Sequence, residues 1–241
     1  MHGDDAYASV MPLYGPTLAQ EGRSGMGEGV DSRPRLIGIG GASGAGKDVV
    51  ASYLVDHCGY TRLGFADALK EEVLTKFKGT LIAHLLDIGW LYPSDTPDIV
   101  QQGLHEIVWR HRTPLVRCLL QEMGTEVRRA DDPGYWVKRW SRRWQQLKAT
   151  TYVVVPDVRF ENECAALREQ GGILVRVTRP ESSLSHISKA HKSEQMAFRD
   201  SVWDVTLQNN TTLHEFQSDI IEIWAKTLVG EQQFLRSSPS V

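Results

Sequence analysis

A glycine-rich segment near residue 40 carries the most specific chemistry in the chain. Gly41, Gly46 and Lys47 have the G-x-x-x-x-G-K spacing of a phosphate-binding loop. Phosphates need backbone amides pointing inward at close range, which small residues allow, and the start of a following helix adds partial positive charge. Lys47 would then supply a point charge to the β- and γ-phosphates of a nucleotide.

The surroundings of this segment are those of a strand–loop–helix unit. An apolar, β-prone run over residues 36–39 precedes the glycines. A helix is expected to open at Ala45 or Gly46, because apolar residues then recur at helical spacing: Val49, Val50, Tyr53 and Leu54. Nucleotide binding is the interpretation that this context favours, and a plain glycine turn is the alternative.

The residue after the lysine departs from the usual motif. Asp48 stands where a Ser or Thr hydroxyl ordinarily ligates Mg²⁺, and Val49 offers no hydroxyl one position later. Magnesium is still expected, since clustered phosphate charges need a counter-ion. Asp48 could hold the ion through water, cap the helix or orient Lys47, and the sequence leaves these roles open.

An acid and an arginine follow a second apolar run. Asp157 and Arg159 come at the carboxyl end of the run over residues 152–155, and Glu163 falls on the first turn of the next expected helix. In open α/β sheets this edge faces the ligand. The three side chains suit a polar substrate with a phosphate and hydroxyls, and the alternative is a helix cap with a surface ion pair.

A third cluster begins at Arg117, which shares a helix face with Gln121 four residues later. Gly124 is expected to end that helix, and Thr125 could donate a hydrogen bond to a phosphate or a base. Arginine forks match phosphate oxygens bidentately. The alternative is that the arginines here form a solvated helix face.

Three tryptophans recur every four residues between basic ones. Trp136, Trp140 and Trp144 alternate with lysine and arginine over residues 136–144. Such a helix could be an aromatic and basic nucleic-acid surface, but a tryptophan core face with a charged outer face is favoured. Trp136 alone could also stack on a base.

The remaining patterns predict a parallel sheet covered by helices on both sides. Further strands are expected over residues 152–155, 173–178 and 202–207. A helix over 161–170 should stop at Gly171-Gly172, and the last helix should begin near Thr212. Short hydrophobic strands that alternate with helices indicate the α/β class.

The long stretch over residues 64–150 is helical in pattern and rich in Arg, His and Trp, so it is interpreted as a substrate-binding insertion with a loop at 93–97. It belongs to a domain spanning 34–228. A lid-like segment is expected over 180–200. Residues 1–33 and 229–241 lack periodicity and are interpreted as extensions outside the fold.

Composition excludes several classes of protein. The 241 residues are 41% hydrophobic and 24% charged, with a net charge of −3, which gives no global attraction to DNA or to a membrane surface. Three dispersed cysteines argue against a disulfide framework and favour a reducing cytoplasm. No apolar run approaches the roughly 18–20 residues of a membrane span.

Together these residues resemble the bacteriophage-type deoxynucleoside monophosphate kinases, a branch of the phosphate-loop nucleotide kinases. The resemblance runs in matching order from about residue 35 to 225, and it is poor over 79–113. The segments that carry it are Gly41–Asp48, Phe65–Glu71, Leu119–Glu126, Tyr135–Lys138, Pro156–Arg159 with Glu163, and Arg179-Pro180.

The resemblance implies a three-layer α/β phosphate-loop kinase that transfers the γ-phosphoryl group of ATP to a deoxynucleoside monophosphate, with Mg²⁺. It also implies a homodimer, and a supplier of DNA precursors. The implied ATP-binding residues are Gly41, Ser43, Gly44, Ala45, Gly46, Lys47, Asp48, Val49 and Arg179. The implied acceptor-binding residues are Lys70, Glu71, Arg117, Gly124, Thr125, Arg129, Trp136, Asp157, Arg159 and Glu163.

Within these sets, Lys47, Arg117, Asp157 and Arg159 are the expected catalytic residues, and Asp48 or Asp157 could hold the metal. Two alternatives remain. One is another small-molecule kinase, similar to dephospho-coenzyme A kinase, whose acceptor would not need Trp136. The other is a nucleotide-dependent DNA-binding module that uses the Trp/Arg helix; no nucleic-acid or membrane partner is otherwise expected.

Overall fold

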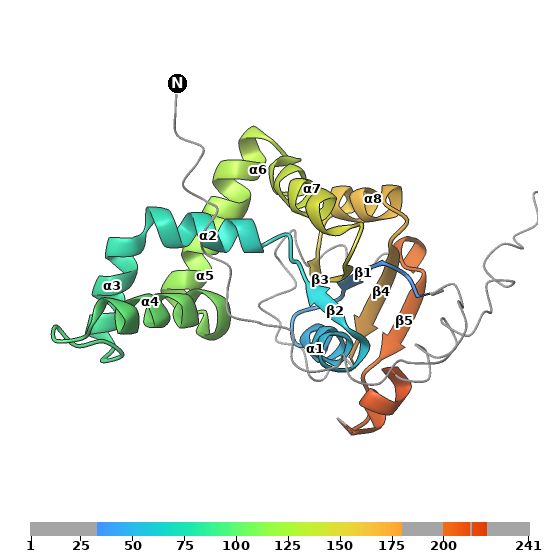
Figure 1. The fold of residues 1–241 in the computed structure, drawn as a ribbon, viewed down its shortest axis with the longest axis horizontal. Coiled ribbons are helices and arrows are strands. Elements are labelled where there is room, and N and C mark those ends of the chain that lie inside the picture. The colour runs from blue at the N-terminus through green and yellow to red at the C-terminus, as the bar shows by residue number, and fades with distance from the viewer. Residues whose placement is uncertain (1–32, 180–199, 213, 221–241) are drawn as a thin grey trace, which may run out of the picture. The chain divides into compact units, whose positions relative to one another are not determined.

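A five-stranded parallel sheet forms the centre of the computed structural model, which describes residues 33–179, 200–212 and 214–220. The strands lie in the order β2-β3-β1-β4-β5 (Figure 1). Their bounds are β1 Leu36–Gly40, β2 Tyr60–Arg62, β3 Tyr152–Val158, β4 Ile173–Thr178 and β5 Val205–Gln208. All neighbouring pairs are parallel, so the carboxyl ends of the strands share one edge.

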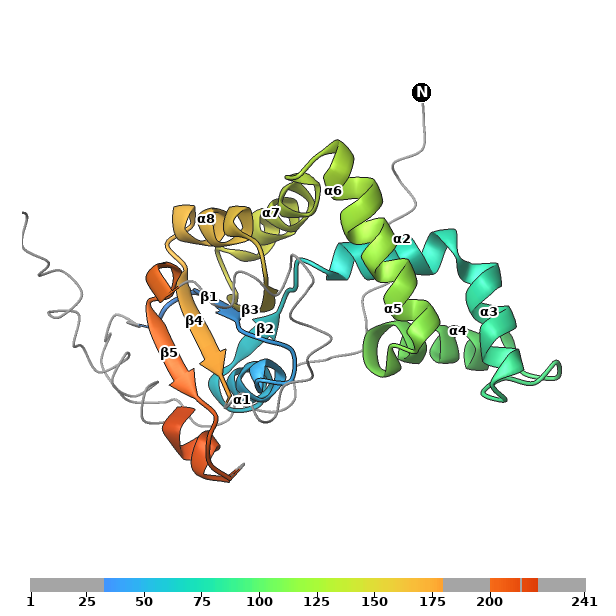
Figure 2. The same cartoon turned by 180° about the vertical axis from the view of Figure 1, so that it is seen from behind.

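Two helical layers cover the sheet. Helix α1 (Lys47–Cys58) lies on one face, and α7 (Tyr135–Leu147) and α8 (Glu161–Glu169) lie on the other, as both views show (Figures 1 and 2). Every residue of β1 is buried, and alternate side chains enter the two hydrophobic clusters on either side. The predicted three-layer α/β fold is therefore confirmed.

The residues between β2 and α7 form a helical region with its own hydrophobic cluster. Its α-helices are α2 Asp67–Lys76, α3 Lys78–Asp87, α4 Pro97–Glu106, α5 Pro114–Gln121 and α6 Arg128–Asp131. Two π-helical segments, η1 (Ile107–His111) and η2 (Glu122–Val127), follow α4 and α5. The expected helical character of this stretch and its loop before Pro97 are confirmed.

The three tryptophans of α7 form a core face. Trp136, Trp140 and Trp144 are 2%, 1% and 3% exposed. Their indole N–H groups donate to Gly124 O, Leu63 O and Gln170 Oε1. Burial removes the ring faces from solvent, so the favoured interpretation of this helix as a core element holds, and an aromatic nucleic-acid surface does not form here.

Three sequence-based expectations need correction. Strand β2 was not predicted, because only Tyr60 of its three residues is buried. The last strand begins at Val205, since Asp200–Val202 forms a 3-10 turn (η6) instead. Gly124 does not end a helix: it lies inside η2, which continues into α6. A Cβ at Gly124 would lie 2.8 Å from Leu69 Cδ2, so this glycine allows α2 and η2 to pack closely.

Parts of several predictions fall outside the described residues, namely the extension before Arg33, most of the lid-like segment over 180–200 and the tail. The last predicted helix is present over residues 214–220, with Phe216 and Ile220 buried against α1. Within the described ranges, no helix combines the length and apolar character that crossing a lipid bilayer requires.

Candidate functional site

The glycine-rich loop turns between β1 and α1 through backbone conformations that favour glycine. Gly41, Gly44 and Gly46 have φ values of 134°, 78° and 108°. A Cβ at Gly41 would lie 2.1 Å from Val177 O, and one at Gly46 would lie 2.6 Å from the amide of Asn209. Ser43 and Gly44 are exposed at the tip of the loop.

Two side chains, one from the start of α1 and one from the end of β5, donate hydrogen bonds to the main chain of the loop. Lys47 begins α1 and is 9% exposed; its Nζ donates to Gly41 O at 2.8 Å and to Ala42 O at 2.6 Å. Asn209, just after β5, donates from Nδ2 to Ala45 O at 2.9 Å. The lysine ammonium thus folds back over the loop and bonds to its main chain.

Asp48 is paired with an arginine that sequence reasoning missed. Arg62 Nη2 donates to Asp48 Oδ1 at 2.7 Å, and the Asp48 side chain is 76% exposed. Some loss of hydration raises the pKa of Asp48, but the hydrogen bond and charge of Arg62, with the charges of Arg112 and Lys47, lower it overall. No sequence pattern marked Arg62, because it lies on the unpredicted β2.

Asp157 holds the start of the helical region against the sheet. Its Oδ1 accepts from Phe65 N at 2.9 Å and its Oδ2 accepts from Ala66 N at 2.8 Å. Both carboxylate oxygens therefore cap the chain just before α2. The bonded amides lie in the turn that precedes α2, so Asp157 fixes that turn and does not cap the helix that follows β3.

Next to this cap lies a buried carboxylate–ammonium pair. Asp67 Oδ2 accepts from Gly64 N at 2.7 Å, and its Oδ1 lies 3.4 Å from Lys70 Nζ. Burial raises the pKa of Asp67. The positive charge of Lys70 opposes this rise, and the negative charge of Asp157 adds to it. Lys70 is 5% exposed, and its Nζ lies 5.9 Å from the centre of the Trp109 ring.

Glu163 and Arg129 form a second buried pair at the loop between β3 and α8. Glu163 Oε1 accepts from Arg129 Nη2 at 2.5 Å, and Oε2 accepts from Arg159 N at 2.7 Å. Glu163 is 2% exposed, and burial raises its pKa to about 7 against the lowering effect of Arg129. Glu163 thus contacts the side chain of Arg129 and the main-chain amide of Arg159.

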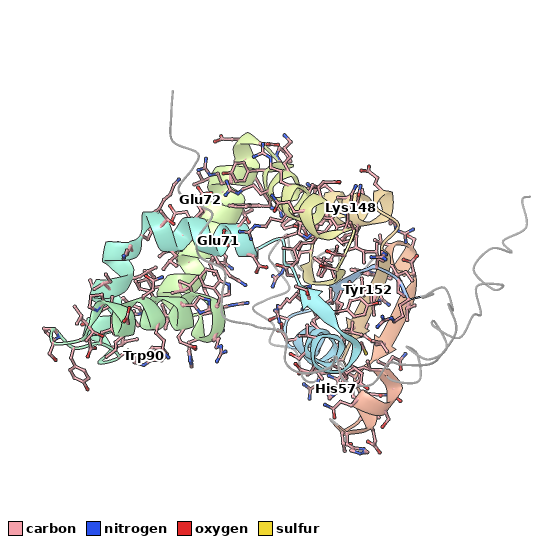
Figure 3. All side chains as sticks on the ribbon, viewed as in Figure 1. His57, Glu71, Glu72, Trp90, Lys148 and Tyr152 are labelled. Atoms are coloured by element: carbon pink, nitrogen blue, oxygen red, sulfur yellow. The ribbon has the colours of Figure 1, made fainter. Side chains whose placement is uncertain are left out.

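The acidic pair on α2 joins the helical region to α7. Arg143 Nη2 donates to both oxygens of Glu71, at 2.6 and 2.7 Å, and Arg128 binds Glu72. Figure 3 labels both glutamates on α2. Glu71 is therefore engaged in an ion pair between helices.

The other predicted residues are more dispersed. Arg117 is exposed on α5, and its Nε donates to Arg112 O at 3.0 Å, so its contact is with the end of η1. Thr125 and Val49 are half-buried, and Arg179 is exposed just after β4. Trp136 is fully enclosed under Gly124, so its ring has no face open to a base, and we correct its stacking role to a packing role.

Comparison with known proteins supports the inference from the residues. The sequence model of the family "Deoxynucleotide monophosphate kinase" matches residues 94–220. A "Putative deoxynucleotide monophosphate kinase" of Acanthamoeba polyphaga mimivirus is 33% identical over 197 residues, which cover 77% of this chain and 94% of that protein. The deoxynucleotide monophosphate kinase of Enterobacteria phage T4 is 32% identical over 110 residues, 44% of this chain and 43% of that protein.

Among solved structures, a dephospho-CoA kinase from Campylobacter jejuni matches 81% of this chain and 98% of its own, with a TM-score of 0.41 and 14% sequence identity. That likeness is too distant to carry a functional argument. The family match covers more than half of the chain, and the viral relative is matched over nearly its whole length. The chain is a phosphotransferase and belongs to the deoxynucleotide monophosphate kinase family.

Proposed function

We propose that this enzyme transfers the γ-phosphoryl group of ATP to a deoxynucleoside monophosphate, giving ADP and a deoxynucleoside diphosphate. One structural observation carries the proposal. Gly40, where the phosphate loop begins, is paired with Val158, where the loop containing Arg159 begins. The proposed donor site and the proposed acceptor site would therefore lie at neighbouring strand ends, as transfer between two anions requires.

The donor side of the proposed site is the loop over Gly41–Lys47. Its small residues leave the backbone accessible, and Lys47 would exchange its contacts with Gly41 O and Ala42 O for the β- and γ-phosphates. Arg179 is proposed to contribute from the end of β4. No general base is needed, because the attacking phosphate of the acceptor is already ionised.

On the acceptor side we propose four cations at the phosphate: Lys70, Arg117, Arg129 and Arg159. Asp157, Glu71 and Glu163 are each engaged in hydrogen bonds or ion pairs with the chain itself. They are therefore proposed to shape the site through their neighbours. Gly124 and Trp136 support it by packing, with Thr125 beside them.

Magnesium would neutralise charge on the transferred phosphoryl group. Asp48 fits that ion, because it is an exposed carboxylate directly after Lys47 and oxygen is the donor that Mg²⁺ prefers. Asp157 fits less well, since both of its oxygens already accept backbone hydrogen bonds. Within the described ranges, no group of three or more potential metal-ligating side chains occurs.

The proposal extends to the organisation of the chain. The kinase domain would span 34–228, with an acceptor-binding insertion over about 64–150 and a lid-like segment over 180–200. A homodimer with ATP and the acceptor as small-molecule partners, which the family resemblance implies, belongs to the same proposal. So does a cytoplasmic location, which the three dispersed cysteines favour.

The test is a coupled assay of ADP formation with ATP and Mg²⁺. The acceptors are dAMP, dCMP, dGMP, dTMP, the matching ribonucleotides and dephospho-coenzyme A. Turnover confined to deoxynucleotides supports the proposal and assigns the base preference. Turnover of dephospho-coenzyme A alone, or of no acceptor by a chain that still binds ATP, refutes it.

A further inference from the structure

The carboxylate of Glu163 is enclosed although it lies on the first turn of a helix. Its side chain is 2% exposed, and Oε2 accepts from Arg159 N at 2.7 Å and from Phe160 N at 3.1 Å. Oε1 accepts from Arg129 Nη2 at 2.5 Å. Both oxygens are engaged by the chain, so this carboxylate can act on a substrate only through the groups that it holds.

Arg129 is the group that it holds most closely. The Arg129 side chain is 12% exposed, and its Cζ lies 3.8 Å from the centre of the Phe160 ring. Nη1 makes a longer contact with Pro133 O, at 3.4 Å. Within the described part of the chain Nε has no hydrogen-bond partner, so the guanidinium is fixed in orientation while retaining a donor for an anion.

Glu163 therefore ties two distant segments to each other. Arg129 comes from α6, near the end of the helical region, whereas Arg159 and Phe160 form the loop after β3. Without the negative charge between them, the guanidinium would keep its contact with the Phe160 ring but would lose the ion that joins it to the main-chain amide of Arg159. An orientation fixed in advance is what makes an arginine effective at a phosphate.

We propose that Glu163 is a positioning residue, whose carboxylate holds Arg129 against the β3–α8 loop in the orientation that binds the acceptor phosphate. The inference rests on the proposed function, because it assumes that the acceptor is a phosphate monoester. It assigns to Glu163 an indirect role, and to Arg129 the direct contact.

The ionisation of Glu163 provides a readout specific to this role. The charged groups that act on its carboxyl are Arg129 from α6 and Asp157 from β3, and burial raises its pKa to about 7. Cys164, next to it on α8, has a pKa raised to about 12 and stays neutral. The sheet and α7 present apolar side chains to α8. Acceptor binding should therefore strengthen as the pH rises through about 7.

The experiment compares the full-length enzyme with the variant Glu163→Gln, which keeps the shape and removes the charge. We expect KM for the acceptor to rise about tenfold, the effect of one lost charge-assisted hydrogen bond, with KM for ATP changed less than about twofold. The rise in kcat/KM for the acceptor between pH 6 and 8 should become smaller in the variant and end at a lower pH, because only the second ionisation of the acceptor phosphate, with a pKa of about 6, then contributes. Glu169→Gln, the same change at an exposed site of α8, should behave like the wild type.

A double-mutant cycle separates this role from a structural one. If Glu163 acts through Arg129, adding Glu163→Gln to Arg129→Ala should not raise the acceptor KM further. An unchanged acceptor KM and an unchanged pH profile in Glu163→Gln would overturn the proposal, even if the variant is less stable. If the wild type turns over no nucleotide, the proposed function fails, and the same cycle measured by thermal unfolding still reports whether the Glu163–Arg129 contact exists.

Discussion

Asp48 and Arg62 form an ion pair between α1 and β2, with Arg62 Nη2 2.7 Å from Asp48 Oδ1. The pair places a carboxylate directly beside the loop that we propose to bind ATP. A carboxylate there would repel phosphates unless a cation neutralised it. Arg62 supplies such a cation.

We predict that Asp48→Asn raises the Mg²⁺ concentration for half-maximal turnover about tenfold, because the amide is a poorer ligand for a hard cation. The measurement is a Mg²⁺ titration of the initial rate at fixed ATP. Asp56→Asn, an exposed site on the same helix, is the matched control and should leave the titration unchanged. A normal titration in Asp48→Asn would remove this residue from the metal site.

Lys47→Ala should abolish turnover while leaving the fold intact. Removing the ammonium takes away charge stabilisation at the transferred phosphoryl group, and we expect kcat to fall by about two to three orders of magnitude. Unfolding monitored by circular dichroism should shift by less than about 4 °C, since the two hydrogen bonds lost to Gly41 O and Ala42 O lie within one loop outside the hydrophobic clusters. Lys148→Ala, at the end of α7 (Figure 3), serves as the control. Wild-type turnover in Lys47→Ala would refute the loop assignment.

Gly41→Ala should be strongly destabilising. The backbone there has φ 134°, and the added methyl would lie 2.1 Å from Val177 O, so β4 or the loop must move. We expect a loss of more than about 2 kcal/mol in the free energy of unfolding by urea. Gly79→Ala, on helix α3 with no atom within 4 Å of the new methyl, should instead stabilise by about 0.5–1 kcal/mol.

Trp136→Phe should affect stability and not the choice of base. The change leaves the carbonyl of Gly124 without its buried indole donor, which costs about 1–3 kcal/mol. The relative kcat/KM values for purine and pyrimidine acceptors should stay as in the wild type, because the ring is enclosed. A selective loss for one class of base, at unchanged stability, would restore the stacking role.

The stability of the protein should depend on pH through Glu163. Its pKa is about 7 when folded and 4.5 when unperturbed, so the folded state binds the proton more tightly. The stability that this tighter proton binding contributes is fully present below about pH 4.5 and is lost as the pH rises to about 7. We consider the free energy of unfolding of the wild type minus that of Glu163→Gln, measured by urea denaturation. This difference should fall by up to about 3 kcal/mol between pH 5 and pH 8. A difference that grows with pH would contradict the burial argument.

Elements with a strong local pattern were predictable from the sequence. The strand over 173–178 has the predicted bounds, because an apolar run there ends against clear turn residues. Helix α8 ends at Glu169 just before Gly171, whose φ of 74° explains the predicted stop. The tryptophan face of α7 followed from helical spacing alone.

Features set by distant parts of the chain were not predictable. Strand β2 has one buried residue, and it is a strand because β3 lies beside it. Arg62 lies on this strand, so no local pattern indicated its pairing with Asp48. The sequence predicts that a helix ends at Gly124, but η2 continues through it. The glycine is needed there because Leu69 packs too closely for a larger side chain. The family resemblance placed Arg129 and Glu163 in the same site, but nothing in the sequence predicted that their side chains form an ion pair.

The bond from Asn209 to Ala45 joins residues separated by 164 positions in the chain. β1 likewise pairs only with β3 and β4, which are synthesised more than a hundred residues later. On the ribosome, the glycine-rich turn consequently stays without these neighbours until β3, β4 and Asn209 have emerged. Contacts of such long range make folding slow, so the loop that we propose to bind ATP is completed late in the folding of the domain.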